Sequence, residues 1–560
     1  SIVNVNEGSV GESVMIVGTP FDLVYSSDRV AGNAGNYLLH IPLTADSATG
    51  AELKINWLGQ NSQQTLFDTD FYDFTWNGLD TSNQQILEPI KVEVALTHLY
   101  PGLPPERGYT IRNAYWLGSL DNRRFGLGDW SLSSLHYLHG INAGMDVPTI
   151  LYMGDGSQRS VTPQSITGST IGEAWYVVDD SEPVLYTFDA TGKHLFTRNS
   201  LTNSQLYKFN YNVNNHLISV VDSFNNRTTI VRNTAGAITG IRSPYNQLTK
   251  ITRNTSGWIT RITNPNNEAF VMSYKNAKGL LATFTKPGGQ IATFTYDANG
   301  RLVMDSNSAG NSLSLASTGE GSSYQEITTT TAEGRASSVI STVHEAITPP
   351  GEKIKFQFDS TATDESGLKT TTAFIPDQGF SYSYPGFSYS EAYEPDPRFG
   401  SALSVVDTIN IQGATIANIA FTRSMVNNSA TPTLFNYNTL STSADVNGKV
   451  SQSVYTRASG TTVRTSPQNR TNKTVTDTYG RLLTATFATL APIQFSYDAR
   501  GRLANIKQGT RSSTISYDAN GWVSSITNPL GQINALTHDN AGRVTGMTLP
   551  DGRVISFGYD

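Results

Sequence analysis

A glycine that closes a short polar turn recurs about every 21 residues in two stretches of this chain. The C-terminal series is Gly480, Gly501, Gly521 and Gly542. The earlier series is Gly192, Asn215, Gly236, Gly257, Gly279 and Gly300. Asn is the ordinary substitute for Gly where the backbone φ angle is positive, so its presence in one slot supports a turn. A period of this length predicts an array that grows by adding similar units.

Each unit predicts two antiparallel strands and two turns. A run such as Phe-Thr-Tyr-Asp at 294–297 alternates an aromatic residue with Thr, which is typical of a half-buried strand. A turn follows, a second strand leaves through Leu302, and a second turn rich in Asn, Pro and Gly closes the unit. The repeat positions to which we assign a structural role include Tyr296, Asp297, Gly300, Tyr497, Asp498, Gly501, Tyr517, Asp518, Gly521, Tyr559 and Asp560.

The Tyr-Asp pair has two interpretations. Its Asp could be a catalytic carboxylate or a metal ligand, or it could start the turn by accepting backbone N–H bonds. The pair returns with every hairpin, whereas an active site is made once, so we assign the Asp to the turn and the Tyr to packing. We expect Val at Gly300, Gly501 or Gly521 to cost about 1–3 kcal/mol through strain at positive φ. Asn should be tolerated far better there, and equal losses for Val and Asn would indicate close packing instead.

Composition favours the same class of fold. Only 15% of the residues are charged, while Gly (48), Tyr (26) and Phe (23) are plentiful, which suits strands and tight turns. The net charge is −7 without a basic cluster, which argues against nucleic-acid binding. No apolar run approaches the ~20 residues of a membrane-spanning helix. The chain has no cysteine, so it has neither disulfides nor thiolate metal sites.

The unit Phe-x-Tyr-Asp-x-x-Gly-Arg-Leu at this period resembles the YD repeat of RHS proteins, of the B and C subunits of insecticidal Tc toxins, and of teneurins. The N-terminal segment is also similar to bacterial RHS chains, at Val17–Phe21, Tyr25–Val30, Phe74–Asp80, Leu127–Leu132 and Tyr152–Ser157. The resemblance implies a hollow shell of YD hairpins that commonly encloses a toxic C-terminal polypeptide. It covers residues 10–310 and 475–560, with a degenerate continuation between them.

The number of strands and their spacing also predict a hollow interior, without reference to the resemblance. Residues 188–560 hold about 18 repeats of 21 residues, or ~36 strands, which at ~4.8 Å spacing make a strip ~170 Å long. So long a sheet must curl. Closed into one ring it would be ~55 Å across, too wide for side chains to fill. We therefore expect an all-β fold, a long antiparallel sheet of hairpins that spirals into a hollow barrel or shell.

The expected domains follow the register of the repeat. Residues 1–110 have no 21-residue register and predict a β-sandwich-like cap or plug, and residues 111–180 predict transition strands. Regular repeats cover 181–310 and 471–560. Between them, residues 311–470 predict degenerate repeats with long hairpins, with a separate inserted domain as the lesser alternative. We expect the array to continue beyond Asp560, with an exposed last strand near Ile555–Tyr559.

A search for chemistry finds no catalytic residue, no cofactor site and no metal site. The chain has no Gly-x-Ser-x-Gly elbow, Walker-type loop or His-Glu-x-x-His pair. His136 and His139 should face opposite sides of a strand. The acidic run 68–73 lacks the Gly and Glu of a calcium loop, and Asp179-Asp180 reads as a solvated pair. The single Asp-Pro, at 396–397, has the wrong spacing for the autoproteolytic site that the resemblance implies.

Two functions follow, and neither makes this chain an enzyme. The first is the N-terminal part of a bacterial RHS shell, which sequesters and helps to deliver its own C-terminal effector or toxin. The alternative is an extracellular or cell-surface adhesion module of teneurin-like architecture. Secretion-apparatus or receptor proteins are further candidate partners, and both functions predict a secreted or cell-surface location. A third possibility, an enzyme acting on glycans through aromatic platforms, rests only on the number of aromatic residues.

Overall fold

A computed structural model describes the chain in thirteen segments. They are residues 1–4, 8–43, 48–102, 109–144, 146–166, 174–179, 181–275, 278–318, 324–346, 355–375, 379–414, 416–427 and 435–559. The described residues are almost entirely strands and turns. The helical segments among the described residues are short 3-10 turns, namely η1 (Ser27–Arg29), η2 (Ala34–Tyr37), η4 (Asn122–Phe125) and η5 (Arg457–Ser459). The all-β class expected from the sequence is confirmed.

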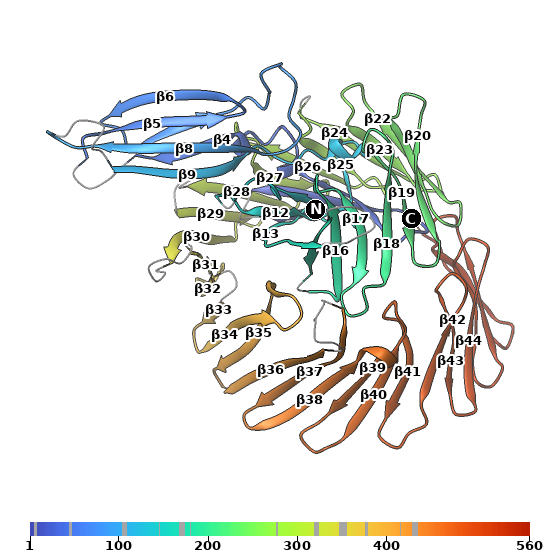
Figure 1. The fold of residues 1–560 in the computed structure, drawn as a ribbon. Helices are drawn as coiled ribbons and strands as arrows, with labels where there is room; N and C mark the ends of the chain where they lie inside the picture. Colours follow the sequence, from blue (N-terminus) through green and yellow to red (C-terminus); the bar gives the residue numbers. More distant parts are fainter. Residues whose placement is uncertain are drawn as a thin grey trace.

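One antiparallel sheet of 35 strands dominates the molecule (Figure 1). Its strands follow one another in chain order, so each hairpin simply adds to the edge of the previous one. The first regular strands are β14 (Gln164–Ile166), β15 (Ala174–Val178), β16 (Val184–Asp189), β17 (His194–Asn199), β18 (Gln205–Tyr211), β19 (Leu217–Asp222), β20 (Arg227–Arg232), β21 (Ile238–Arg242), β22 (Leu248–Arg253), β23 (Ile259–Thr263), β24 (Ala269–Tyr274), β25 (Leu281–Thr285), β26 (Ile291–Tyr296) and β27 (Leu302–Asn307).

The irregular stretch expected over 311–470 continues the same sheet with longer strands. These are β28 (Ser312–Thr318), β29 (Tyr324–Thr331), β30 (Ala336–Ala346), β31 (Lys355–Thr363), β32 (Lys369–Ile375), β33 (Gly379–Tyr384), β34 (Phe387–Asp396), β35 (Gly400–Gln412), β36 (Ala417–Asn427), β37 (Tyr437–Val446), β38 (Lys449–Thr456) and β39 (Thr461–Thr465). The longest of them, β35, has 13 residues. Consecutive strands pair throughout, so the longer hairpins belong to the array.

The regular hairpins then return. They are β40 (Thr471–Thr476), β41 (Leu482–Phe487), β42 (Ile493–Tyr497), β43 (Leu503–Gln508), β44 (Arg511–Tyr517), β45 (Val523–Thr527), β46 (Ile533–His538), β47 (Val544–Thr548) and β48 (Val554–Ser556). Strand β48 pairs with β47 alone, and Ile555 and Tyr559 are 43% and 49% exposed. Among the described residues, no strand pairing closes the sheet into a ring.

The N-terminal region contains two cores rather than the one domain expected over 1–110. A small sandwich packs the pair β4 (Leu38–Pro42) and β7 (Phe71–Thr75) against the sheet β6 (Gln60–Phe67), β5 (Gly50–Trp57), β8 (Ile90–Leu99) and β9 (Tyr109–Leu117). Its core includes Leu53, Ile55 and Trp76. Because β9 supplies an edge of this sandwich, the sandwich extends past residue 110.

The second core joins the first strands of the chain to the long sheet. Strands β1 (Ile2–Asn4), β2 (Ser9–Met15), β3 (Asp22–Ser26) and β10 (Ser131–Leu132) form a sheet. We call residues 8–30 and 120–137 the plug, because their apolar side chains share one buried cluster with residues of β18–β29. Strands β11 (Tyr137–His139), β12 (Thr149–Tyr152) and β13 (Gln158–Val161) lie beside it as a separate small sheet. The plug divides in sequence because the sandwich is inserted between its halves.

The long sheet overlaps itself before it ends. In Figure 1 it bends from the green hairpins through the yellow and orange strands to the red ones, which come back beside the green hairpins. The turn between β19 and β20 contacts the turn between β42 and β43, 23 strands further on. A circuit of 23 strands at ~4.8 Å is ~35 Å across, narrower than the single ~55 Å ring expected from the strand count. We call β41–β48 the second circuit, because they lie against β18–β25 of the first.

Candidate functional site

The Asp of each repeat organises its turn through one carboxylate oxygen. Asp297 Oδ1 accepts the backbone N–H groups of Asn299 and Arg301, at 2.8 and 2.9 Å. The same two bonds are made by Asp498 and Asp518, and by the neutral side chains of Asn212 and Asn528. The turn therefore needs an acceptor oxygen and not a charge. Asp560 lies outside the described residues.

The turn glycines have the expected left-handed backbone, with φ of 79° at Gly300, 82° at Gly501 and 88° at Gly521. Their surroundings add a second constraint. A Cβ on Gly300 would lie 2.1 Å from the carbonyl oxygen of Gly32 in the plug. At Gly501 and Gly521 it would lie 2.4 and 2.5 Å from aromatic ring atoms. The tolerance for Asn expected at these three positions is therefore wrong, because any added Cβ there overlaps a neighbouring group that would have to move.

The Tyr of each repeat ties its hairpin to the preceding one. Tyr517 Oη donates a hydrogen bond of 2.8 Å to the carbonyl oxygen of Leu503, two residues after the previous turn glycine. The same bond, 2.7–2.9 Å long, is made by Tyr211, Tyr274, Tyr296, Tyr497 and Tyr559. The register shifts by one residue beside Tyr517, where it pairs with Val523. This regular bond makes the Tyr a structural link between repeats.

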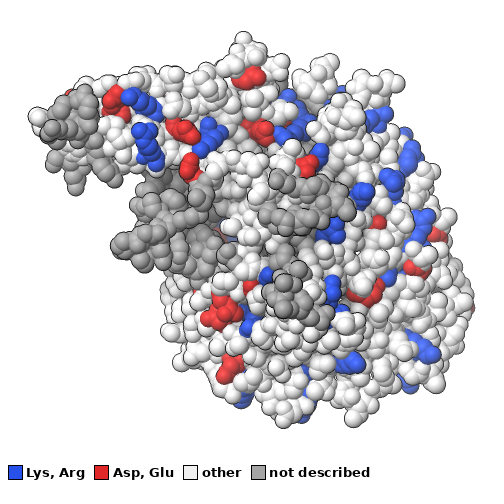
Figure 2. Space-filling model, in the orientation of Figure 1, with Lys and Arg blue, Asp and Glu red and all other residues white. Residues whose placement is uncertain are grey.

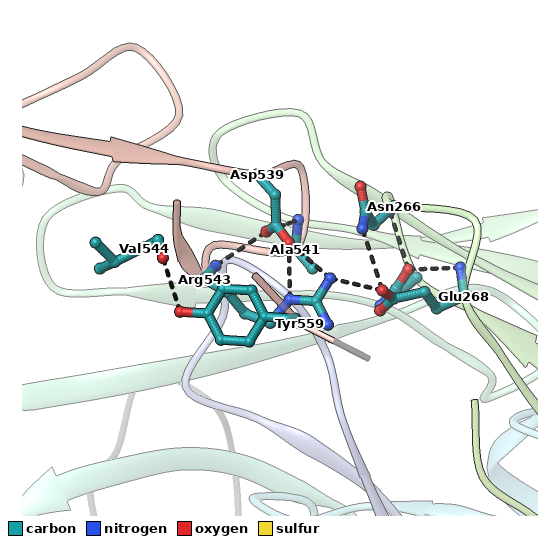
Figure 3. A network of polar contacts seen from close by, with 8 residues as sticks. Asn266, Glu268, Asp539, Ala541, Arg543, Val544 and Tyr559 are labelled. Carbon is teal, nitrogen blue, oxygen red and sulfur yellow. Dashed lines mark hydrogen bonds and ion pairs between the residues drawn. The ribbon is translucent and has the colours of Figure 1, made fainter. Parts of the chain in front are cut away.

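An Arg after the turn glycine completes the unit. Figure 3 shows Arg543 beside Asp539 of its own turn and Tyr559 of the next hairpin. The Arg543–Asp539 ion pair is 2.7 Å, and the guanidinium lies 4.8 Å from the centre of the Tyr559 ring. Arg502 repeats this arrangement with Asp498 and Tyr517, at 2.7 and 4.0 Å. The ladder of Asp, Arg and Tyr thus runs from hairpin to hairpin.

The two circuits meet at a seam of turn-to-turn contacts. Asn226 Nδ2 donates to the carbonyl oxygen of Arg500 at 2.9 Å, and Gln247 Nε2 donates to that of Asn520 at 2.7 Å. Partner residues are separated by 274 and 273 positions. The separations are nearly constant because both circuits advance by about 21 residues per hairpin here, so successive turns of one circuit meet successive turns of the other. We call this set of contacts the circuit seam.

The inner wall of the sheet is the face that contacts the plug, and the plug seals its first part. The residue two positions after the turn glycine is at most 2% exposed at Leu217, Ile238, Ile259, Leu281 and Leu302. Plug atoms accept hydrogen bonds from the backbone N–H groups of three of them. The acceptors are Asp129 Oδ1 for Ile259, Tyr25 Oη for Leu281 and the Gly8 carbonyl for Leu302, at 2.7–2.9 Å. Burial raises the pKa of Asp129 to about 7.

The same wall positions are much less covered in the second circuit. Leu482, Leu503, Val523 and Val544 are only half-buried. Ile526, whose first-circuit counterpart Ile262 is 1% exposed, is 41% exposed. No plug residue contacts these positions through a hydrogen bond in the part of the chain that the structure describes. An apolar wall of the kind that the plug covers is therefore left open.

Aromatic residues extend this open wall. Directly opposed residues of an antiparallel pair share a face, and the pairs run from Ile327, which belongs to the plug cluster, to β34. The aromatic residues on that face include Phe358, Phe374, Phe380, Tyr382, Tyr384, Phe387 and Tyr389. Phe358, Phe374 and Tyr384 are 39–44% exposed. We call these seven residues the aromatic belt.

The residues weighed as metal ligands have structural partners. His136 accepts a hydrogen bond from the Gly154 N–H and packs on His194, whereas His139 lies beside Trp116. Asp73 of the acidic run pairs with His40, Asp179 accepts from Ser181 and Tyr186, and Asp396 accepts from Arg398. Asp180 lies outside the described residues. Within those residues there is no group of three or more potential metal ligands, and no helix could cross a membrane.

Sequence reasoning missed the contacts between distant segments. Glu88 of the sandwich is one example, since it joins Arg124, Tyr137 and His139 at the junction with the shell. Burial disfavours its charge, but these partners hold the pKa of Glu88 at about 2. Glu268 and Arg543 at the circuit seam are another example. A repeat period shows which residues are equivalent but not which repeats face each other, so no sequence signal pointed to these pairs.

A model of the Teneurin YD-shell family matches residues 174–560. This chain belongs to the teneurin YD-shell family. Teneurin-4 of Homo sapiens is 29% identical over 119 residues, which are 21% of this chain and 4% of that protein. Teneurin-3 of Mus musculus is 28% identical over 127 residues, 23% of this chain and 5% of that protein. The chain therefore matches only a small part of the length of these relatives.

Solved structures similar to this YD shell include the TcdB2–TccC3 complex, at 9% identity over 94% of this chain and 39% of that chain. Its TM-score is 0.18. A second structure, which contains Cdc42 as well, has 8% identity, covers 94% of this chain and 32% of that chain, and has a TM-score of 0.24. The family match and the pairing of the strands, with the repeat geometry, therefore carry the assignment.

Proposed function

We propose that this YD shell is an encapsulating scaffold that encloses a polypeptide against its inner wall. The observation that supports the proposal is the difference between the two circuits. Equivalent apolar positions are buried beneath the plug at Ile262 and Leu302 but half-exposed at Ile526 and Leu503. Exposed apolar surface of this kind commonly marks a binding site. The aromatic belt adds further open apolar area to the same face.

In the full form of the proposal, the enclosed polypeptide is a C-terminal effector or toxin of the same longer protein, and the protein is a secreted or surface-exposed bacterial one. The shell itself has no enzymatic role in this scheme and needs no cofactor. The outer surface is consistent with a shell in solution. On the face drawn in Figure 2, acidic and basic residues are interspersed without a large patch of one sign.

The test is limited proteolysis of the complete protein that contains these residues. The enclosed polypeptide should copurify with the shell and resist protease while the shell is intact. Ile526→Glu places a charge on the inner wall and should release or expose the polypeptide. Ser525→Glu, on the outward face of the same strand, is the matched control. If accompanying polypeptide is cleaved as fast in the wild-type protein as in the free state, encapsulation is excluded.

The family match supports a second candidate, adhesion at a cell surface through the outer wall, because the matched model is that of teneurin shells. Secretion-apparatus or receptor proteins would then be the partners. The two functions differ in the face that they use. Cell-surface binding that Ser525→Glu reduces and Ile526→Glu leaves intact would favour adhesion, and the opposite pattern in the protease test would favour encapsulation.

A further inference from the structure

In the circuit seam, the pair of facing turns that contains Trp522 differs from the pairs before it. We call each such pair of turns a step of the seam. At two preceding steps an Arg of the second circuit lies on an aromatic ring of the first. Arg481 lies 4.2 Å from the Phe224 ring centre, and Arg502 lies 5.4 Å from that of Tyr245. At the next step the residue after the turn glycine is Trp522, and the first-circuit position that corresponds to Phe224 is Asn266. Trp522 and Asn266 therefore occupy the positions that hold the Arg and the aromatic ring at the preceding steps.

Trp522 turns toward its own circuit. Its ring packs on His538, at 5.6 Å between centres, and His538 occupies the repeat position that is Tyr in other hairpins. A cavity of about 350 Å³ lies at this step, between the two circuits. Trp522, Tyr245 and Asn520 are among the residues that line it. The cavity thus coincides with the place where the Arg of the ladder is missing.

The cavity opens on the outer wall. Leu248 and Lys250 line it, and they alternate along β22 with Thr249 and Ile251, which are 1% and 5% exposed. Since neighbouring residues of a strand point to opposite faces, Leu248 and Lys250 face outward. A ligand can therefore reach the cavity from solvent without entering the shell.

The lining is rich in neutral amides. Asn246, Asn264, Asn267, Asn520 and Asn540 surround the two aromatic side chains, and Lys250 is the one charged residue of the lining. The side chains of Asn267, Asn520 and Asn540 make no hydrogen bond to other described residues. Each free amide offers two N–H donors and a carbonyl acceptor. Such a set matches hydroxyl groups, which both donate and accept.

We infer that this seam cavity binds a neutral, hydroxyl-rich ligand of one or two sugar rings. The amides would bond the hydroxyl groups, and the half-buried ring of Trp522 offers an apolar face for the C–H side of a pyranose. The volume lies at the lower end of the range for small-molecule sites. A charged sugar is not favoured, because Lys250 is the one charged residue of the lining and the nearby Arg502 and Arg543 are already paired with Asp498 and Glu268.

The inference is tested by titrating the protein with maltose, cellobiose, lactose and N,N′-diacetylchitobiose, with saturation-transfer NMR as the readout. Saturable binding of at least one disaccharide is expected. Trp522→Arg restores the residue found at the equivalent positions 481, 502 and 543, so it should fold, and it should weaken binding at least tenfold by refilling the cavity. Asn520→Ala removes one free amide and should weaken binding about threefold.

Thr514→Ala, on the outer face of β44 and away from the cavity lining, is the control and should bind as the wild type does. If Trp522→Arg fails to fold, Asn520→Ala and Asn540→Ala decide the question, because their side chains support no other described residue. No binding of any of the four disaccharides would overturn the inference. Binding that none of the cavity variants weakens would overturn it too, as would selective binding of a proline-rich peptide instead.

Discussion

Arg543 and Glu268, 275 residues apart, form a 2.5 Å ion pair that joins the second circuit of the sheet to the first (Figure 3). The same guanidinium pairs with Asp539 of its own turn. Glu268 is further bonded by the Asn264 side-chain amide at 2.8 Å. The pair therefore links two local turn structures that the sequence specifies separately.

We expect loss of this pair to loosen the seam without unfolding the hairpins. Both side chains are about 30% exposed, so the expected coupling energy in a double-mutant cycle of Arg543→Ala and Glu268→Gln is about 0.2–1 kcal/mol. Hydrogen exchange of the 539–543 turn should increase in either variant. A coupling that is unchanged between low and high salt would contradict an exposed ion pair.

The seam should also weaken in acid. The hydrogen bond from Asn264, together with Arg543, lowers the pKa of Glu268 below its ordinary value of 4.5. A carboxylate with a depressed pKa stabilises the folded state above its unfolded pKa, and this contribution is lost as the pH falls through the folded value. The protection factors of the seam amides, which correct for the intrinsic exchange rate, should thus fall below about pH 4.5 in the wild type, and Glu268→Gln should abolish the pH dependence that arises from this pair.

The turn glycines should fall into two groups. At Gly257 φ is +90° and no atom lies within 4 Å of an added Cβ, so Gly257→Asn should cost less than about 1 kcal/mol, since Asn tolerates this conformation. At Gly501 the added Cβ would meet the Phe224 ring, so Gly501→Asn should cost about 1–3 kcal/mol in overpacking at the seam. Chemical denaturation measures both. Similar losses at the two positions would show that backbone conformation alone governs them.

The hydrogen bond from the repeat Tyr to the preceding hairpin should contribute most to the free energy of unfolding where it is buried. Tyr296→Phe leaves the Leu281 carbonyl without its 2.9 Å hydrogen bond inside the plugged core and should cost about 1–3 kcal/mol. Tyr517→Phe removes the equivalent bond to Leu503 at the half-buried wall, where water can replace it, and should cost about 0.5 kcal/mol. Thermal unfolding of the two variants should separate them. Equal losses would mean that the second-circuit wall is as dry as the first.

Two buried histidines should make the fold sensitive to mild acid. Burial lowers the pKa of His136 to about 3, and burial also lowers that of His194 well below 6.5. Because the unfolded chain binds these protons near pH 6.5 and the folded chain does not, stability is lost as the pH falls from about 6.5 toward 3. His136→Gln keeps an acceptor for the Gly154 N–H. Its unfolding free energy should therefore fall less between pH 7 and 5 than that of the wild type.

The structure within one hairpin could be predicted from the sequence because the same residues recur in every repeat. The positive φ of Gly300, the acceptor role of Asp297 and the alternation of Phe294 and Tyr296 all act within about ten residues, so one hairpin contains the whole signal. Their recurrence then predicted the antiparallel sheet in chain order and its hollow interior. These features follow from backbone sterics and strand spacing, which are the same in every copy.

Which repeats of the two circuits contact each other was decided only by the tertiary structure. The 23-strand circuit depends on the accumulated twist and coil of many hairpins, and small differences in each one add up before the seam closes. That circuit places Gly501 against Phe224 and Arg543 against Glu268, and it leaves a cavity beside Trp522. The split plug covers Leu302 but does not cover Leu503, although both occupy the same repeat position. Identical local sequences therefore have different environments, because long-range packing depends on the path of the whole sheet and not on any one repeat.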